Sequence, residues 1–412
     1  MNVTITPAPL SGVIAPPPSK SAAHRLIITA ALGGGISTIR NVAFSQDIEA
    51  TLRCMAALGT GVEHMDNHTL RIHGLGHSVP QAPLPGDALP HFDCGESGST
   101  LRFLIPIALA VAGGGVFTGR GRLMERPQKP YFDLFDEKGI LWQQENGVLT
   151  VRGKLAPGEY RLPGNVSSQF FTGLLLALSL LDAPSAIVST TVLESADYIG
   201  MTIDSMAGAG VSVTVSEDGR TFHVTPAPYR AFDAAVEADW SQAGFWYAAN
   251  FLDNRLELQG LNPRSSQGDM VVSELYWQLA RPGDTEIDLS GCPDLLPPLA
   301  VMAAVRSGTT RFVNAARLRI KESDRLATVH RMLTALGGCS EELPDGLTVQ
   351  GVSKLTGGTV DGANDHRIVM AAAIAATACT APVTITDAQA VQKSYPSFWE
   401  EYQRLGGKFD VL

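Results

Sequence analysis

A repeated pattern of helix, glycine, strand, turn and second strand is the feature of this chain that most limits its fold. Five helical segments end at a glycine and are followed by a strand-like segment, at Gly59, Gly139, Gly210, Gly337 and Gly406. Glycine ends a helix at low cost because it readily adopts the left-handed backbone conformation. In four places a second strand-like segment follows a turn, over residues 67–74, 146–153, 218–225 and 345–351.

The gap between Gly210 and Gly337 is long enough for two units, with a degenerate marker at Arg281-Pro282-Gly283. The pattern therefore predicts six similar units. Each unit also contains a second helix of unusually apolar composition. These helices begin near Ser19, Ser97, Ser167, Asp239, Asp294 and Asp365. Serine and aspartate are typical N-cap residues, and a helix that is apolar on nearly all sides is buried.

The chain length indicates two domains. Its 412 residues exceed the roughly 250–300 at which a single hydrophobic core stops growing. We expect an α/β fold of two domains with three units each, in which sheets pack around buried helices. The expected domains are residues 14–233, and residues 1–13 together with 234–412.

Composition excludes several classes of function. The formal net charge of -10 argues against general affinity for nucleic acid or for an anionic membrane surface. The five cysteines form no C-x-x-C pair, and no histidine spacing suggests a metal site. Met1 to Pro18 does not resemble a signal peptide, and the apolar run from Phe170 to Leu181 is too short to span a bilayer. We expect a cytoplasmic, reduced protein without a metal.

Cationic and hydroxyl side chains recur at the starts of the predicted buried helices. The first such helix opens with Pro18-Ser19-Lys20-Ser21 and continues to Arg25. A helix N-terminus attracts anions because its N–H groups are unpaired and carry partial positive charge. Similar chemistry recurs in other segments: residues 95–100, Arg126, residues 165–169, residues 319–325, residues 364–367 and Lys393.

Each of these segments alone can be explained without a function, as a solvated helix start, a surface charge or a structural histidine. Their equivalent positions in a repeat protein favour a shared role. Two three-unit domains that meet at these ends would gather six helix N-termini and several cations around one cleft. Such a cleft suits a pair of substrates with several negative charges.

With these residues in view, the sequence resembles the EPSP synthase family, the 3-phosphoshikimate 1-carboxyvinyltransferases, along its whole length. The resemblance rests on five motifs: residues 18–21 with Arg25, Ser167-Ser168-Gln169, residues 321–326, Asp365-His366-Arg367, and Lys393 with Tyr395-Pro396. The family fold is two domains, each of three βαβαββ units around buried helices, described as an inside-out α/β barrel. The expected activity is transfer of the enolpyruvyl group of phosphoenolpyruvate to the 5-hydroxyl of shikimate 3-phosphate, without a cofactor.

The resemblance also implies roles for individual residues. The expected contacts of shikimate 3-phosphate are Lys20, Ser21, Arg25, Ser167, Ser168, Gln169, Tyr198, Asp294 and Lys321. The expected contacts of phosphoenolpyruvate are Lys20, Gly98, Arg126, Gln169, Arg325, Arg367 and Lys393. The expected catalytic residues are Asp294, Glu322 and Lys20. The 14–233 domain would mainly hold shikimate 3-phosphate, and the other domain phosphoenolpyruvate and the catalytic residues.

Three positions depart from the usual family pattern. The family loop Gly-Asn-(Ala/Ser)-Gly-Thr is Gly95-Glu96-Ser97-Gly98-Ser99 here. Glu96 either points away from the bound anion, or pairs with an arginine, or alters substrate affinity. Phe103 replaces a frequent proline, and Arg317 replaces an asparagine found in some members.

Two alternative functions are open to a chain of this kind. The first is enolpyruvyl transfer to UDP-N-acetylglucosamine, but that enzyme has Lys-Asn where this chain has Lys20-Ser21. The second is a non-catalytic relative that binds an anionic metabolite, and the acid–base set of Asp294, Glu322 and Lys20 argues against it. We expect small-molecule substrates as the only partners, a monomer, and no binding to nucleic acid or membrane.

Overall fold

The computed structural model describes residues 1–76 and 88–412. Its contacts divide the chain into a middle unit, Lys20–Val236, and a terminal unit, Met1–Ser19 with Glu237–Leu412. These limits differ slightly from the expected 14–233, and hydrogen bonding explains why. Strand β2 (Ser11–Ile14) pairs in parallel with β15 (Arg255–Leu258), and the Ser19 N–H donates to the Glu237 carbonyl, so residues up to Ser19 stay with the terminal unit.

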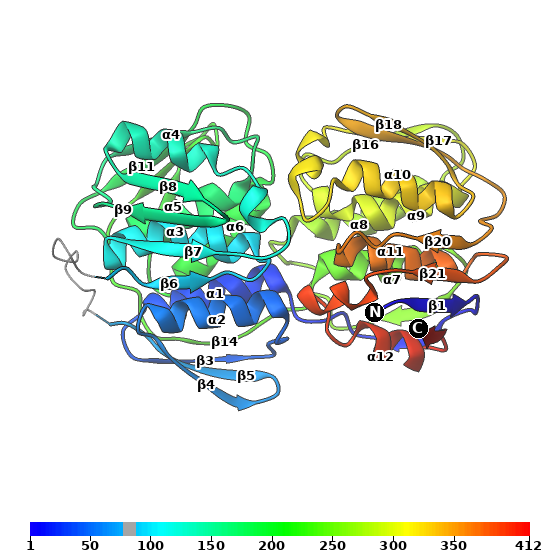
Figure 1. Cartoon of the computed structure of the whole chain (residues 1–412), viewed down its shortest axis with the longest axis horizontal. Coiled ribbons are helices and arrows are strands. Elements are labelled where there is room, and N and C mark those ends of the chain that lie inside the picture. Colours follow the sequence, from blue (N-terminus) through cyan, green and yellow to red (C-terminus); the bar gives the residue numbers. More distant parts are fainter. Residues whose placement is uncertain (77–87) are drawn as a thin grey trace. The chain divides into compact units, whose positions relative to one another are not determined.

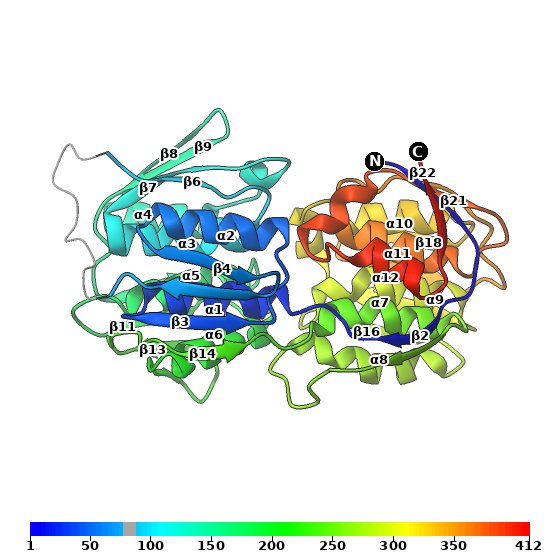
Figure 2. The ribbon, with the colours of Figure 1, turned by 90° about the horizontal axis from the view of Figure 1, so that it is seen from below.

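Three four-stranded sheets form the outside of the middle unit, and Figures 1 and 2 show them around the helices. In each sheet an edge strand runs parallel to its neighbour, and the remaining strands are antiparallel. The strand orders are β14 (Asp233–Ala235), β3 (Ile36–Arg40), β5 (Thr69–His73), β4 (Gly61–Asp66); β6 (His91–Asp93), β7 (Gly114–Thr118), β9 (Val148–Arg152), β8 (Leu141–Glu145); and β10 (Glu159–Leu162), β11 (Ser185–Ser189), β13 (Thr221–Val224), β12 (Val213–Val215).

Helices of two kinds alternate along the middle unit. The inner helices are α1 (Lys20–Leu32), α3 (Gly98–Ala112) and α5 (Ser168–Leu178), and the outer ones are α2 (Gln46–Ala57), α4 (Lys129–Lys138) and α6 (Ala196–Gly208). Helix α3 is buried without interruption from Thr100 to Leu109, and Gly98 and Val111 are buried as well. Gly139 ends α4 with the left-handed backbone that the sequence pattern predicts.

The terminal unit contains the same four-stranded sheet pattern in two of its three repeats, and the third repeat has a smaller sheet. Its four-stranded sheets are β16 (Thr285–Asp288), β17 (Thr309–Val313), β19 (Gly346–Gln350), β18 (Cys339–Leu343); and β20 (Gly358–Val360), β21 (Val383–Ile385), β1 (Val3–Thr6), β22 (Lys408–Val411). The second of these is completed by the start of the chain, because β1 lies between β21 and β22. The repeat that carries the degenerate marker Arg281-Pro282-Gly283 has only the two-stranded sheet β15–β2 in the described residues.

The inner helices of the terminal unit are α7 (Trp240–Phe251), α9 (Leu296–Val305) and α11 (His366–Ala376), and the outer ones are α8 (Val272–Ala280), α10 (Arg325–Ala335) and α12 (Phe398–Arg404). Short 3₁₀ turns precede or connect them: η2 (Gly268–Val271), η3 (Pro293–Leu295), η4 (Ala316–Ile320) and η5 (Ala388–Lys393), with η1 (Leu123–Glu125) in the middle unit. Each unit has its own hydrophobic core around its inner helices. The predicted α/β fold of repeated units around buried helices is confirmed.

The inner helices begin close to the predicted residues. Ser97, Ser167, Asp239 and Asp365 cap their helices, because each accepts a hydrogen bond from a backbone N–H in the first turn. Asp294 is not a cap: it lies in η3, and the N-cap of α9 is Leu295, without a side-chain hydrogen bond. All five cysteines are free. In the described ranges, no helix is long and apolar enough to cross a membrane.

Candidate active site

The predicted site residues lie at the N-terminal ends of the inner helices, and each unit is considered by itself. In the middle unit, Lys20 is the first residue of α1, and its ammonium forms an ion pair of 2.7 Å with Asp47 in the first turn of α2. Ser21 follows on α1, and its carbonyl accepts a hydrogen bond of 2.7 Å from Arg25. The partner Asp47 was not predicted from the sequence, because nothing local links residues 20 and 47.

Arg25 lies deep among the helices of the middle unit. Its guanidinium donates to the Thr202 hydroxyl at 2.9 Å and to the Tyr198 carbonyl at 2.8 Å. It also lies over the rings of Phe103 and Tyr198. Burial lowers the pKa of Arg25 to about 10, so the group is positively charged at neutral pH. The structure therefore brings the predicted residues Arg25 and Tyr198 into direct contact.

Gln169 is fixed at both ends of its side-chain amide. Its Oε1 accepts a hydrogen bond of 2.9 Å from Arg102, and its Nε2 donates to the Ser99 hydroxyl at 3.0 Å. Because arginine has no acceptor, this pairing decides which end of the amide is the oxygen. Ser167 caps α5, and Ser168 begins that helix. The sequence did not single out Arg102 or Ser99 as neighbours of Gln169, since their contact joins α3 to α5.

Gly98 and Arg126 lie against each other at the start of α3. A Cβ added to Gly98 would lie 2.5 Å from an Arg126 guanidinium nitrogen, so only glycine leaves room for that group. Both residues are buried, and Ser97 caps the helix. The structure thus places the two residues side by side, and their joint action on one anion stays a prediction.

Glu96, the main departure from the family loop, lies against the neighbouring loop at Gly121. A Cβ added to Gly121 would lie 2.6 Å from a Glu96 carboxylate oxygen. Gly121 has a φ of 55°, which favours glycine on its own account. The carboxylate of Glu96 therefore lies against the backbone at Gly121.

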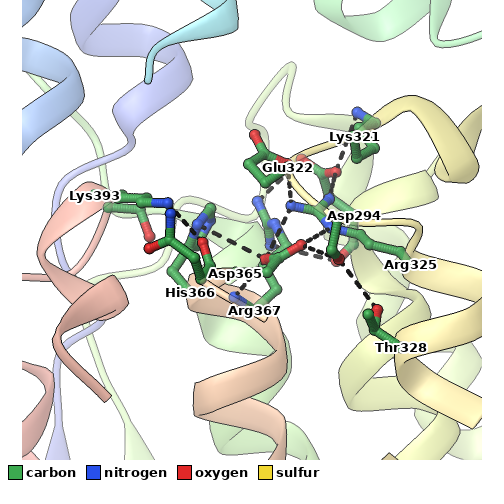
Figure 3. Close-up of polar contacts among 12 residues, drawn as sticks. Asp294, Lys321, Glu322, Arg325, Thr328, Asp365, His366, Arg367 and Lys393 are labelled. Atoms are coloured by element: carbon green, nitrogen blue, oxygen red, sulfur yellow. Dashed lines mark hydrogen bonds and ion pairs between the residues drawn. The ribbon is translucent and has the colours of Figure 1, made fainter. Parts of the chain in front are cut away.

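In the terminal unit, Asp294 lies among three cations, and Figure 3 shows them directed toward its carboxylate. Its Oδ1 accepts from Arg325 at 2.7 Å and from Lys321 at 3.3 Å, and its Oδ2 accepts from Arg367 at 3.0 Å. Burial by itself would raise the pKa of Asp294, but Arg367, Lys321 and Arg325 outweigh it and hold the pKa well below its usual range. Asp294 is therefore an ionised carboxylate at the start of a buried helix.

Arg325 connects the carboxylates of this cluster, and its side chain is only 1% exposed. It donates to Glu322 at 2.6 Å and to Asp365 at 2.9 Å, in addition to Asp294. Burial opposes the charge of Arg325, but Asp365, Glu322 and Asp294 together raise its pKa. Asp365 also caps α11, so the buried ion pair ties the starts of α10 and α11 together.

One further predicted cation, Lys393, lies beside the start of α11, and Arg367 also reaches the start of α7. The Lys393 ammonium donates to the Asn364 carbonyl at 2.6 Å, just before the start of α11. Arg367 donates to the Ser241 hydroxyl at 2.8 Å, which adds the start of α7 to the cluster. Arg317, the third departure, is buried and donates to the Ser290 carbonyl. Ser241 was missed by the sequence analysis, although its place after the Asp239 cap made it a candidate.

Comparison with known proteins identifies the family of this chain. The family EPSP synthase (3-phosphoshikimate 1-carboxyvinyltransferase) matches residues 5–402. The chain belongs to this family. A 3-phosphoshikimate 1-carboxyvinyltransferase of Clostridium novyi is 42% identical over 99% of this chain and 98% of its own, and one of Clostridium acetobutylicum is 43% identical over 98% and 97%. The family predicted from the sequence motifs is thus confirmed.

Solved structures of lower identity support the fold of the EPSP synthase family. An EPSP synthase of Acinetobacter baumannii covers 100% of both chains with a TM-score of 0.79 at 23% identity. The enolpyruvyl transferase NikO of Streptomyces tendae covers 99% of this chain and 98% of its own, with a TM-score of 0.76 at 15% identity. At these identities the two likenesses speak for the fold alone.

Proposed function

We propose that this chain transfers the enolpyruvyl group of phosphoenolpyruvate to the 5-hydroxyl of shikimate 3-phosphate and releases phosphate. The observation that carries the proposal is Asp294, an ionised carboxylate at a helix start, in contact with Lys321, Arg325 and Arg367. Binding of an anion alone needs no carboxylate among its cations. An acid–base reaction of anionic substrates needs both, and the curated relatives carry the name of this activity.

The two substrates draw on different residues. For phosphoenolpyruvate we infer contacts with Gly98, Arg126 and Gln169 of the middle unit, with Arg325, Arg367 and Lys393 of the terminal unit, and with Lys20. For shikimate 3-phosphate we infer Lys20, Ser21, Arg25, Ser167, Ser168, Gln169 and Tyr198 of the middle unit, with Asp294 and Lys321 of the terminal unit. Arginine suits this role because its planar donors match the oxygens of carboxylates and phosphates.

Asp294 is the inferred base on the 5-hydroxyl. With its cations around it, the carboxylate is ionised but is a weak proton acceptor. An anionic substrate that takes over contacts of Lys321, Arg325 or Arg367 weakens their hold on Asp294. The pKa of Asp294 then rises, so the carboxylate becomes a stronger base when the substrates are present.

The reaction proceeds by addition and then elimination. The hydroxyl oxygen adds to C2 of phosphoenolpyruvate, its proton passes to Asp294, and C3 takes up a proton to give a tetrahedral intermediate. Loss of a C3 proton and of phosphate then forms the enolpyruvyl product. Glu322 and Lys20 are the inferred proton donors and acceptors at C3 and at the leaving phosphate, each within an ion pair that orients it, with Arg325 at 2.6 Å and Asp47 at 2.7 Å.

The deciding experiment measures phosphate release from phosphoenolpyruvate with either shikimate 3-phosphate or UDP-N-acetylglucosamine as the acceptor. We expect release with shikimate 3-phosphate alone. Release with UDP-N-acetylglucosamine would assign the chain to the other acceptor. Absence of release with both, in folded protein that binds shikimate 3-phosphate, would identify a binding protein and overturn the proposal.

A further inference from the structure

A second contact between α1 and α2 lies one helical turn beyond the Lys20–Asp47 ion pair. His24 and Thr51 each lie four residues after a member of that pair, so they occupy the same helix faces. The Nδ1 atom of His24 is 2.8 Å from the Thr51 hydroxyl. The imidazole is fully buried and meets the Phe103 ring edge-on, with 6.4 Å between ring centroids.

From Thr51 the hydrogen bonds continue to the start of α3. The hydroxyl of Thr51 lies 2.7 Å from that of Thr100, and the Thr100 hydroxyl donates to the Ser97 hydroxyl at 2.8 Å. Ser97 is the N-cap of α3, and its hydroxyl also accepts from the Thr100 backbone N–H. His24, Thr51, Thr100 and Ser97 are all 0% exposed. The chain of hydroxyls therefore joins three helices in a part of the unit without solvent.

The direction of these hydrogen bonds follows from their arrangement. Since Thr100 gives its hydroxyl hydrogen to Ser97, the hydrogen between Thr51 and Thr100 comes from Thr51. Thr51 must then accept from His24, so the hydrogen of the imidazole is on Nδ1. The Nε2 atom is left as an acceptor, and it has no hydrogen-bond partner within residues 1–76 and 88–412.

The surroundings of His24 keep the imidazole neutral. Burial, followed by the nearby charges of Lys20 and Arg25, holds the pKa of His24 well below its ordinary value. A neutral imidazole with one donor and one acceptor is the form that the hydroxyl chain requires.

We propose that His24 is a positioning residue of the reaction: as an Nδ1–H donor it sets, through Thr51 and Thr100, the place of Ser97 and Gly98 relative to Lys20. This inference rests on the proposed function, in which Gly98 and Lys20 both contact phosphoenolpyruvate. Its physical basis is that α1 carries Lys20 and α3 carries Gly98. Thr51 of α2 links these two helices through its hydrogen bonds to His24 and Thr100. A shift of about 1 Å between groups that hold one substrate can cost up to about 100-fold in rate.

The test uses isosteric variants of the full chain in steady-state assays of phosphate release. Thr51→Val keeps the shape but breaks the middle of the hydroxyl chain. We expect it to raise KM for phosphoenolpyruvate about tenfold. The KM for shikimate 3-phosphate should change less than about twofold, since the Lys20–Asp47 ion pair is intact. Thr29→Val is the matched control, because Thr29 is equally buried on α1 and bonds to Ser205 outside the hydroxyl chain.

Two variants of His24 separate the hydrogen bond from simple packing. His24→Asn places an amide N–H donor near the position of Nδ1, whereas His24→Leu removes the donor and keeps an apolar side chain of similar bulk. We expect His24→Asn to recover most of the phosphoenolpyruvate KM that His24→Leu loses. Equal KM values for phosphoenolpyruvate in wild type, Thr51→Val and His24→Leu would overturn the proposal.

The tautomer gives a readout that needs no substrate. Nitrogen-15 NMR of labelled protein distinguishes an imidazole protonated on Nδ1 from one protonated on Nε2. We expect the Nδ1–H form for His24, assigned by loss of its signal in His24→Asn. An Nε2–H form would contradict the proposal even if all kinetics agreed. Wild-type protein without phosphate release would instead refute the proposed function, so the two failures are distinguishable.

Discussion

Asp294 is the residue on which the proposed chemistry most depends. We expect Asp294→Ala to lower kcat by about 10²–10⁴-fold, the usual contribution of a general acid or base. Much of the binding of shikimate 3-phosphate should persist, because most of its inferred contacts lie in the middle unit. The measurements are steady-state kinetics and a titration with shikimate 3-phosphate. Normal turnover at saturation with lost binding would show that Asp294 is a binding residue only.

A matched control for this variant is Asp288→Ala. Asp288 ends β16 in the same unit and bonds to the Ser290 N–H and the Asn314 amide. Within residues 1–76 and 88–412, its carboxylate forms no ion pair with Lys321, Arg325 or Arg367. We expect its turnover to equal that of wild type.

We expect Lys321 to make the affinity for shikimate 3-phosphate depend on pH. Burial lowers the pKa of Lys321 to about 8, although Asp294 favours its charged form. The ammonium is positive below this pKa and neutral above it, so affinity for an anion should fall as the pH rises from about 7 to 9.5. In Lys321→Arg the charge persists over this range, and the affinity should stay nearly constant. Titrations at several pH values test this, and an equal fall in both proteins would contradict it.

At the start of α3, the position of the helix leaves no room for a side chain at residue 98 beside the Arg126 guanidinium. At Gly98 a methyl group would meet the Arg126 guanidinium at 2.5 Å, so Gly98→Ala must displace that cation. We expect the KM for phosphoenolpyruvate to rise about tenfold, because a displaced arginine no longer matches the anion. The KM for shikimate 3-phosphate should change much less. Steady-state kinetics with each substrate varied in turn decides between these outcomes.

Gly200→Ala on α6 is the control for this substitution. Nothing lies within 4 Å of the added Cβ at Gly200. Alanine in a helix interior is favoured over glycine by up to about 1 kcal/mol, so the variant should be as active and slightly more stable. A similar rise in KM in both variants would mean that the Arg126 contact is not responsible.

At the scale of the whole molecule, the inferred substrate contacts are divided between two units with separate hydrophobic cores. Lys20 and Arg25 belong to one unit, and Lys321 and Arg325 to the other. We infer that shikimate 3-phosphate contacts residues of both sets, so we expect it to change the small-angle scattering profile toward a more compact particle. Identical profiles with and without the ligand would contradict closure. A monomer in the cytoplasm stays a prediction, and the same scattering data give the mass.

The sequence by itself determined the repeating units, the starts of the inner helices and the family. These features are local: a cap, a run of apolar residues and a terminating glycine each act within one element. The motifs around Lys20, Ser167, Lys321 and Asp365 were therefore readable from residue types and spacing, and so were most of the cations of the candidate site.

The tertiary structure decided which of these residues are partners. It pairs Lys20 with Asp47, surrounds Asp294 with three cations, and directs Glu96 to Gly121. It also inserts β1 between β21 and β22, which completes a sheet with strands from both ends of the chain. Such contacts join residues far apart in sequence, and they form because burying a charge or a polar group requires a partner. Sequence patterns within one element do not determine which distant residue becomes that partner.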